Sequence, residues 1–527
     1  MKLVTAAQMQ AIDHETIHEF GVPGIVLMEN AARGAVRFFL ELFPNAAFQR
    51  IGIMAGRGNN GGDGFVMARY LAQKGFQVTI FLLADTQKVS GDAALNLNLL
   101  PKLAVPVLEL KDDTAFSQHH SQLVHQHIWI DAVFGTGLNS NVRGHYKTAL
   151  EFLNQSGHPI FSVDIPSGLS ADTGKPSGTA VKATATATFA FAKPGHILLP
   201  GALYTGKLKI IDIGIPPHIA DTQNTNLRVI TPGRLKKEWR PRNLDDHKGR
   251  FGHILVVAGS PGKTGAAAMT AMAAMRAGAG LVTLAVPKSI HSQAEILAVE
   301  PMTTPLPEEP GGVLGLSATN AIDKLLIGKT VLVIGPGLGT HPETRKLVGE
   351  LVANATIPVV VDADGLNGLT HQLDCLARCK SQIILTPHPG EMARLVNQET
   401  AAIQNDRINI ALQFAVHHKV HLVLKGANTL IASPNGIMDI NPTGNPGMAS
   451  GGMGDVLTGL IAGFLAQGYT PPSACRFGVY LHGTAADQLA VIKGPQGFLA
   501  SDVSTMIPET INSLVNHPPS GNWQAIF

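Results

Sequence analysis

Polar side chains that could do chemistry follow short apolar runs in the first half of the chain. Ile128–Ile130 is followed by Asp131, and Ile160–Val163 is followed by Asp164 and then Ser167. Carboxylate and hydroxyl oxygens are hard ligands that suit an s-block cation, and a carboxylate can also move a proton. The alternative for each lone Asp is a helix cap or a turn residue.

A glycine-rich turn follows another apolar run. Residues 56–61 satisfy G-x-G-x-x-G, and Asp85 closes the next apolar run, which alone would predict an NAD-dependent dehydrogenase. The pattern is short, however, and Asn59, Asn60 and Asp63 bring polar side chains to a turn that otherwise needs only small residues. Asn and Gly also suit an ordinary tight turn. The motif by itself leaves both interpretations open.

The second half carries a comparable set of residues. Lys425 follows the apolar run His421–Leu424, and Asp455 follows Gly451–Gly454 directly before the apolar stretch Val456–Leu465. Glycine amides at a helix N-terminus would hold migrating phosphate oxygens, and a carboxylate there could accept a hydroxyl proton. Asp455 could also be an ordinary residue of a first helical turn.

Two other turns in this half have specific alternatives. Gly262-Lys263-Thr264 has the ending of a phosphate-binding P-loop, but position 257 is Val where that motif needs Gly, so a P-loop kinase is not expected. Thr386–Glu391 has the features of a helix start, with an early Pro and a Glu near the positive end of the helix. A helix start can also bind an anion, so both roles are compatible.

The apolar runs alternate with helix-like segments, which predicts parallel sheets covered on both faces. Expected strands are Ile51–Ala55, Gln77–Leu83, Ile128–Ile130, Ile160–Val163, His253–Ala258, Leu281–Val286, Val331–Ile334, Val359–Val361, Ile383–Leu385 and His421–Leu424. Between the halves, Ile215–Asn243 is rich in Pro, Asn, Thr and basic residues and lacks a strong strand. We therefore predict two α/β domains, residues 1–229 and 230–527, with ligands at the carboxyl ends of the strands.

Composition excludes several classes of protein. The 527 residues carry a net charge of +2, which gives no electrostatic basis for binding nucleic acid or an acidic membrane. Three cysteines, Cys375, Cys379 and Cys475, argue against a disulfide framework, and no ligand set for zinc accompanies them. The apolar stretch 266–286 contains Arg276 and two glycines and predicts a helix followed by a buried strand rather than a membrane span. We expect a cytoplasmic enzyme with reduced thiols.

The first half resembles the NAD(P)H-hydrate epimerase family on three motifs, Leu27–Ala32, Asn59–Asp63 and Val163–Gly168. The resemblance implies a Rossmann-like fold, a nicotinamide nucleotide hydrated at C6 as substrate, and a potassium ion. Asn60, Asp131 and Ser167 would contact potassium, and Asp164 would be the principal acid–base residue. The implied substrate contacts are Asn59, Asn60, Gly61, Gly62, Asp63, Gly135, Thr136, Gly137, Leu138, Asn139, Ser140, Asn141 and Asp164.

The second half resembles the ADP- or ATP-dependent NAD(P)H-hydrate dehydratases of the ribokinase-like superfamily on Thr386–Glu391, Lys425–Thr429 and Gly451–Asp455. The implied contacts to the hydrate are Ala266, Gly339, His388 and Asp455, with Asp455 catalytic. The implied contacts to the nucleotide are Lys425, Gly426, Ala427, Asn428, Thr429 and Gly454. ADP is the expected co-substrate, ATP stays open, and Mg²⁺ would offset the charge at the phosphates.

Together the two resemblances imply repair of hydrated NADH and NADPH. The first half would interconvert the R and S epimers, and the second would dehydrate the S form at the expense of ADP. Substrates would be small molecules, with neither nucleic acid nor membrane as partner, and a homo-oligomer stays open. The alternatives are a small-molecule kinase fused to a Rossmann-type domain, or a nucleotide-binding sensor without turnover.

Overall fold

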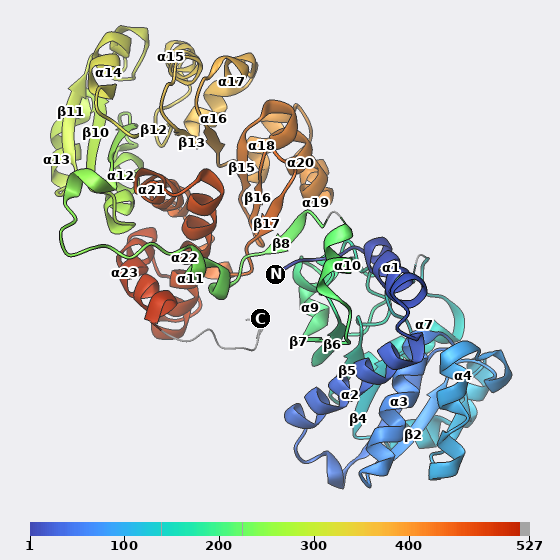
Figure 1. The fold of residues 1–527 in the computed structure, drawn as a ribbon. Coiled ribbons are helices and arrows are strands. Elements are labelled where there is room, and N and C mark those ends of the chain that lie inside the picture. The colour runs from blue at the N-terminus through green and yellow to red at the C-terminus, as the bar shows by residue number, and fades with distance from the viewer. Residues whose placement is uncertain (139, 224, 517–527) are drawn as a thin grey trace. The chain divides into compact units, whose positions relative to one another are not determined.

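A computed structural model of the chain describes residues 1–138, 140–223 and 225–516 (Figure 1). The chain divides into two compact units, Lys2–Leu227 and a second unit whose described part is Met1 together with 228–516. Each unit has its own sheet and its own buried core.

The first unit is built on a seven-stranded sheet in the order β3-β2-β1-β4-β5-β6-β7, and neighbouring strands run parallel. Its strands are β1 (Arg50–Ala55), β2 (Gln77–Leu82), β3 (Val107–Glu109), β4 (Ile128–Ala132), β5 (Ile160–Val163), β6 (Ala185–Phe189) and β7 (Lys207–Ile211). The order reverses at β1, so the turns after β1 and β4 flank the point where such sheets bind ligands.

Helices cover both faces of this sheet, and their bounds are α1 (Ala6–His14), α2 (Gly24–Leu42), α3 (Asn59–Gln73), α4 (Gly91–Leu97), α5 (Asp113–Gln118), α7 (Gly144–Gln155) and α8 (Pro194–Ile197). Phe39 of α2 and Phe65 of α3 belong to the core on one face. Trp129 of β4 packs with Phe116 and Leu150 on the other. Apolar side chains on both sides of the strands therefore explain why the strands read as nearly continuous apolar runs.

The second unit is built on a ten-stranded sheet in the order β11-β10-β9-β12-β13-β14-β15-β16-β17-β8. Its strands are β8 (Leu227–Val229), β9 (His253–Val257), β10 (Leu281–Pro287), β11 (Met302–Leu306), β12 (Val331–Ile334), β13 (Val359–Val361), β14 (Ile383–Leu385), β15 (His421–Leu424), β16 (Leu430–Ala432) and β17 (Met438–Ile440). The strands from β11 to β15 are parallel, and β15, β16 and β17 pair antiparallel.

The principal helices of this unit are α11 (Pro232–Glu238), α12 (Thr264–Arg276), α15 (Pro342–Ala353), α16 (Asp364–Leu369), α17 (Asp374–Arg378), α18 (Pro389–Val396), α20 (Arg407–His418), α21 (Met453–Ala466), α22 (Pro471–Lys493) and α23 (Ala500–Asn516). Helices α12 and α21 pack closely because small residues face each other. A Cβ added at Gly459 of α21 would lie 2.2 Å from the carbonyl oxygen of Thr270. This contact fixes α21, whose first turn carries Asp455.

The predicted α/β class with parallel sheets is confirmed, and each of the ten expected strands is present within one or two residues. The stretch 266–286 is a helix and a strand as expected, α12 and β10, and no helix in the described residues has the length and apolar character needed to cross a membrane. The segment Ile215–Asn243 does contain the short strand β8, because three residues suffice to add an edge to the second sheet.

Candidate functional site

A cavity of about 710 Å³ lies at the carboxyl ends of β1, β4 and β5 in the first unit. Eight of the predicted substrate contacts line it: Asn59, Asn60, Asp63, Gly135, Thr136, Gly137, Leu138 and Asp164. The turns after three separate strands therefore meet around one space, as the parallel sheet requires.

The turn after β1 owes its glycines to close packing. A Cβ added at Gly61 would lie 1.9 Å from the carbonyl oxygen of Gly56, so only glycine fits where the first turn of α3 meets the strand end. The same turn carries Asn60 and Asp63, both buried. Burial, and next the negative charge of Asp164, raise the pKa of Asp63 well above its usual range.

Asp164 forms a buried ion pair that its position in the sequence does not reveal. Lys193, just before α8, is 1% exposed and donates from Nζ to Oδ1 of Asp164 at 2.7 Å, while the amide of Thr136 donates to Oδ2 at 3.2 Å. Burial alone would raise the pKa of Asp164, but the charge and hydrogen bond of Lys193 bring it below its usual value. Asp164 also has a φ of +64°, an uncommon conformation that clusters at functional sites. The carboxylate is therefore held ionised and fixed in direction.

Sequence reasoning missed Lys193 and Asp13, which both line this cavity. Asp13 lies in the last turn of α1, and burial raises its pKa to about 6, with Lys193 opposing and Asp164 reinforcing the rise. The available signal for Lys193 was a single cation after the run Ala185–Phe189. No comparable signal marked Asp13, because an Asp in an amphipathic N-terminal helix is ordinary.

Three residues predicted to hold potassium lie beside the cavity. Asp131 is fully buried, and its Oδ2 accepts hydrogen bonds from the hydroxyl of Ser162 and the amide of Ser167, both at 2.8 Å. Both amide atoms of Asn60 are buried without a hydrogen-bond partner among the described residues. The unpartnered amide oxygen of Asn60, the buried carboxylate of Asp131 and the hydroxyl of Ser167 are the kinds of oxygen ligand that suit a monovalent cation.

The substrate and potassium contacts all stay predictions, and some of the predicted residues lie away from the cavity. Gly61, Gly62, Ser140 and Asn141 do not line the cavity as described, and Ser140 and Asn141 are exposed. Asn139 lies outside the described residues.

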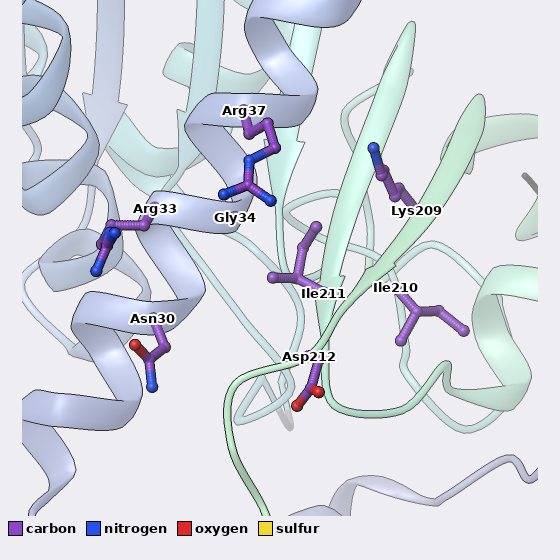
Figure 2. Close-up of a pocket in the computed structure, with 8 residues that line it drawn as sticks. All are labelled: Asn30, Arg33, Gly34, Arg37, Lys209, Ile210, Ile211 and Asp212. Atoms are coloured by element: carbon purple, nitrogen blue, oxygen red, sulfur yellow. The ribbon is translucent and has the colours of Figure 1, made fainter.

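A second cavity of the first unit, about 330 Å³, lies between α2 and β7 (Figure 2). Arg33 and Arg37 of α2 line it, as does Lys209 of β7, whose Nζ pairs with Oε2 of Glu41 at 2.5 Å. None of the residues predicted as site residues lines it.

In the second unit, Lys425 lies at the centre of a buried polar cluster. Its Nζ donates to Oδ1 of Asp362 at 2.7 Å, and the hydroxyl of Thr458 donates to Oδ2 of the same carboxylate at 2.7 Å. Although burial opposes it, the charges of Asp362 and then Glu391 raise the pKa of Lys425. Lys425 is therefore a fixed cation just after β15.

Asp455 occupies the first turn of α21, next to this cluster. A Cβ added at Gly454 would lie 3.3 Å from Nζ of Lys425 and 3.7 Å from Oδ2 of Asp362, which places the cluster against the helix start. Burial, followed by the charge of Asp362, raises the pKa of Asp455 to about 7. The first amides of a helix have no carbonyl partner within it, so the Lys425 ammonium and free amides meet where a phosphate could bind.

The segment Thr386–Glu391 forms the helix start that the sequence suggested, and His388 is the N-cap of α18. Its Nδ1 accepts a hydrogen bond from the amide of Gly390 at 3.0 Å, and its own amide donates to Oε2 of Glu391 at 2.8 Å. Burial, and next the charge of Lys425, lower the pKa of His388, so the ring is neutral near pH 7.

Gly339 and Ala266 lie at neighbouring turns. The amide of Gly339 donates to Oδ2 of Asp364 at 2.8 Å, and the same oxygen accepts from Nζ of Lys263 at 2.9 Å. A Cβ added at Gly337 would lie 3.3 Å from Cβ of Ala266. The turns after β9 and β12 are thus joined through Lys263 and Asp364.

The loop Lys425–Thr429 is braced by a residue that sequence reasoning missed. Arg407, the first residue of α20, donates from Nη1 to the carbonyl of Ala427 at 2.5 Å and from Nη2 to those of Leu424 and Lys425 at 3.3 Å each. A planar guanidinium can serve several carbonyls at once, which an ammonium cannot match.

If this loop holds the nucleotide, as the resemblance implies, Arg407→Met should weaken ADP binding about tenfold, since the loop loses three hydrogen bonds to a charged donor. Arg407→Lys should lose less. Titration calorimetry with ADP checks this, with exposed Arg378→Met as the control. Equal affinity in Arg407→Met and the parent would show that the loop holds its shape without the brace.

Comparison with known proteins gives one consistent result. A family model described as "NAD(P)H-hydrate dehydratase" matches residues 254–509, and one described as "YjeF-related protein N-terminus" matches residues 24–195. The bifunctional NAD(P)H-hydrate repair enzyme Nnr of Moorella thermoacetica is 43% identical over 515 residues, which cover 98% of this chain and 97% of that protein.

Two solved structures resemble the second unit. The ADP/ATP-dependent NAD(P)H-hydrate dehydratase of Bacillus subtilis, crystallised with ATP and Mg²⁺, is 29% identical, covers 55% of this chain and 99% of that chain, and has a TM-score of 0.49. A ribokinase-like superfamily protein of Enterococcus faecalis is 25% identical, covers 55% and 98%, and has a TM-score of 0.48.

The resemblance inferred from the motifs is confirmed, and so is the predicted α/β class with a Rossmann-like first half, whose sheet has the strand order 3-2-1-4-5-6 typical of that fold. The match extends over both sheets and nearly the whole chain, and the matched proteins carry both halves in one polypeptide. The chain belongs to the family of bifunctional NAD(P)H-hydrate repair enzymes.

Proposed function

We propose that the chain epimerises hydrated NADH and NADPH in residues 1–229 and dehydrates the S epimer at the expense of ADP in residues 230–527. The observation that carries the proposal is the cluster of Lys425, Gly454 and Asp455, where a cation, helix-start amides and a carboxyl with a pKa of about 7 meet. This set can hold a phosphate and take a proton from the attacking hydroxyl.

The dehydration then follows in two steps. Asp455 accepts the C6 hydroxyl proton while that oxygen attacks the terminal phosphate of ADP, and AMP leaves. The ring nitrogen next pushes out the phosphate, and loss of a C5 proton restores the dihydronicotinamide. Phosphorylation matters because hydroxide is a poor leaving group.

Hard cations fit both halves of the chain. Asn60, Asp131 and Ser167 would hold K⁺, which would offset the buried charge of Asp131 beside the cavity. The carboxylate of Glu391, whose Oε2 lies 3.7 Å from Nζ of Lys425, suits Mg²⁺, which would neutralise phosphate charge.

The fixed carboxylate of Asp164 supports epimerisation in the first half. A dehydratase site fits only one epimer of a chiral hydrate. An epimerase therefore allows both epimers of the mixture to be converted completely. The substrates are small molecules, so we place the activity in the cytoplasm and assign no nucleic-acid or membrane partner. A homo-oligomer is compatible with this function.

The test follows recovery of the reduced-nicotinamide absorbance from an R and S mixture of hydrates. With ADP we expect complete recovery, with AMP and phosphate formed in equal amounts. Nucleotide consumption without the hydrate, or only with a sugar or vitamin, would favour a kinase. Tight binding without turnover would favour a sensor.

A further inference from the structure

Asp13 is a further carboxyl group in the cavity of Asp164, and no motif match assigns it. It comes from α1, which Thr5 and Gln8 fix through a capping box, so its position does not depend on a loop. Its half-buried side chain lines the cavity and makes no hydrogen bond within the described part of the chain. A carboxyl that faces a ligand cavity without a protein partner is available to a ligand.

The charged surroundings of Asp13 come from four other elements. The charge of Lys193 lowers the pKa of Asp13 and the charge of Asp164 raises it. The charge of Asp13 in turn raises the pKa of Asp63. The charged side chains that line the cavity with it are Arg57, Asp63, Asp92, Asp164 and Lys193. Asp164 is paired with the only lysine among them, so Asp13 and Asp164 occupy unlike environments within one cavity.

Epimerisation of the hydrate needs two proton transfers. C6 carries a hydroxyl and is bonded to N1, so it is a hemiaminal carbon. Its configuration inverts if the C6–N1 bond breaks, the new aldehyde turns, and N1 adds to its other face. Opening removes a proton from the hydroxyl and supplies one to N1, and closure reverses both transfers without any net redox change.

We propose that Asp13 is the general acid of this reaction, giving its proton to N1 as the C6–N1 bond breaks, while the Asp164 carboxylate takes the hydroxyl proton. The inference rests on the proposed epimerase function and adds a catalytic residue to it. On closure Asp13 takes the N1 proton back, and Asp164 returns its proton to the C6 oxygen, so both groups end as they began.

The electrostatics of the cavity support this division. The pKa of Asp13 is raised to about 6 and that of Asp164 is lowered, which leaves one carboxyl able to carry a proton and the other ionised. Two carboxyls whose environments separate their pKa values are the usual sign of an acid and a base acting together.

The test compares Asp13→Asn and Asp13→Glu in the full chain, measuring R-to-S conversion across pH. In the parent, kcat/KM should fall about tenfold per pH unit above a pKa near 6, as the acid ionises. Asp13→Asn should lose about 10²-fold at pH 6 and lack this fall, whereas Asp13→Glu should keep the fall at a reduced rate. Exposed Glu19→Gln is the matched control from the same region.

Two readouts separate chemistry from folding. Dehydration of pure S hydrate by the same samples should be unchanged, and Asp13→Asn should not melt earlier at about pH 7.5, because an ionised, half-buried Asp13 costs stability above its pKa. Parental epimerisation by Asp13→Asn, or a uniform loss that keeps the fall above pH 6, would overturn the inference. A parent chain that leaves R hydrate untouched would reject the proposed function, and this inference with it.

Discussion

Replacing Asp455 with Asn slows dehydration of the S hydrate about 10²–10⁴-fold while ADP binding stays close to that of the parent. Asn keeps the size of the side chain at this first-turn position of α21, but it cannot accept the C6 hydroxyl proton. The rate is measured by absorbance recovery from pure S hydrate, and ADP affinity by calorimetry.

The raised pKa of Asp455 also predicts how the rate of dehydration depends on pH. A general base must be ionised to act, and burial with the charge of Asp362 brings the pKa of Asp455 to about 7. The parental rate should therefore rise between about pH 6 and pH 8 and then level off, since ionisation is complete above the pKa. The residual activity of Asp455→Asn should lack this rise.

A first-turn carboxylate elsewhere separates catalysis from helix stabilisation. Asp374 is exposed in the first turn of α17, and Asp374→Asn tests what the loss of such a charge does to stability alone. Near-parental turnover by Asp455→Asn would mean that Asp455 only stabilises α21, and that another group is the base.

Strand-end residues were predictable because the sheets are parallel. Continuous apolar runs located the strands, and a parallel sheet brings the carboxyl ends of its strands to one edge. The residues that follow these runs, Asp131, Asp164 and Lys425, could therefore be proposed as site residues before the packing was known. The turn around Gly61 was harder to interpret. Its glycines satisfy a cofactor motif, yet Gly61 is required by contact with a backbone carbonyl.

Residues that reach a site from outside this pattern were not predictable. Asp13 comes from a helix before the sheet begins, and Arg407 from a helix that precedes its loop in the chain, so neither follows an apolar run. The strand β6 reads Ala-Thr-Ala-Thr-Phe, which lacks the long apolar side chains that marked the other strands, and Lys193 was overlooked with it. Strands β16 and β17 are three residues each, too short for a periodic signal.

Replacing Asp164 with Asn should lower the rate of R-to-S conversion by about 10²-fold or more, whereas the rate of dehydration of S hydrate should not change. Asn tolerates the left-handed conformation that Asp164 adopts, so the backbone at φ +64° should persist. Loss of the base alone would explain the result. The ion pair, however, offers a second explanation that has to be separated from it.

Asp164→Asn leaves Lys193 charged, 1% exposed and without its carboxylate, and an uncompensated buried charge costs about 3–5 kcal/mol. The first unit of the single variant should therefore unfold at a lower denaturant concentration than the first unit of the parent. Asp164→Asn combined with Lys193→Met removes the charge at similar size, and should recover most of that stability while staying inactive as an epimerase. Recovery of epimerisation along with stability would show that Asp164 serves only to neutralise Lys193. A stable and inactive double variant, with normal turnover of S hydrate, shows that the loss of epimerisation does not come from the uncompensated charge of Lys193.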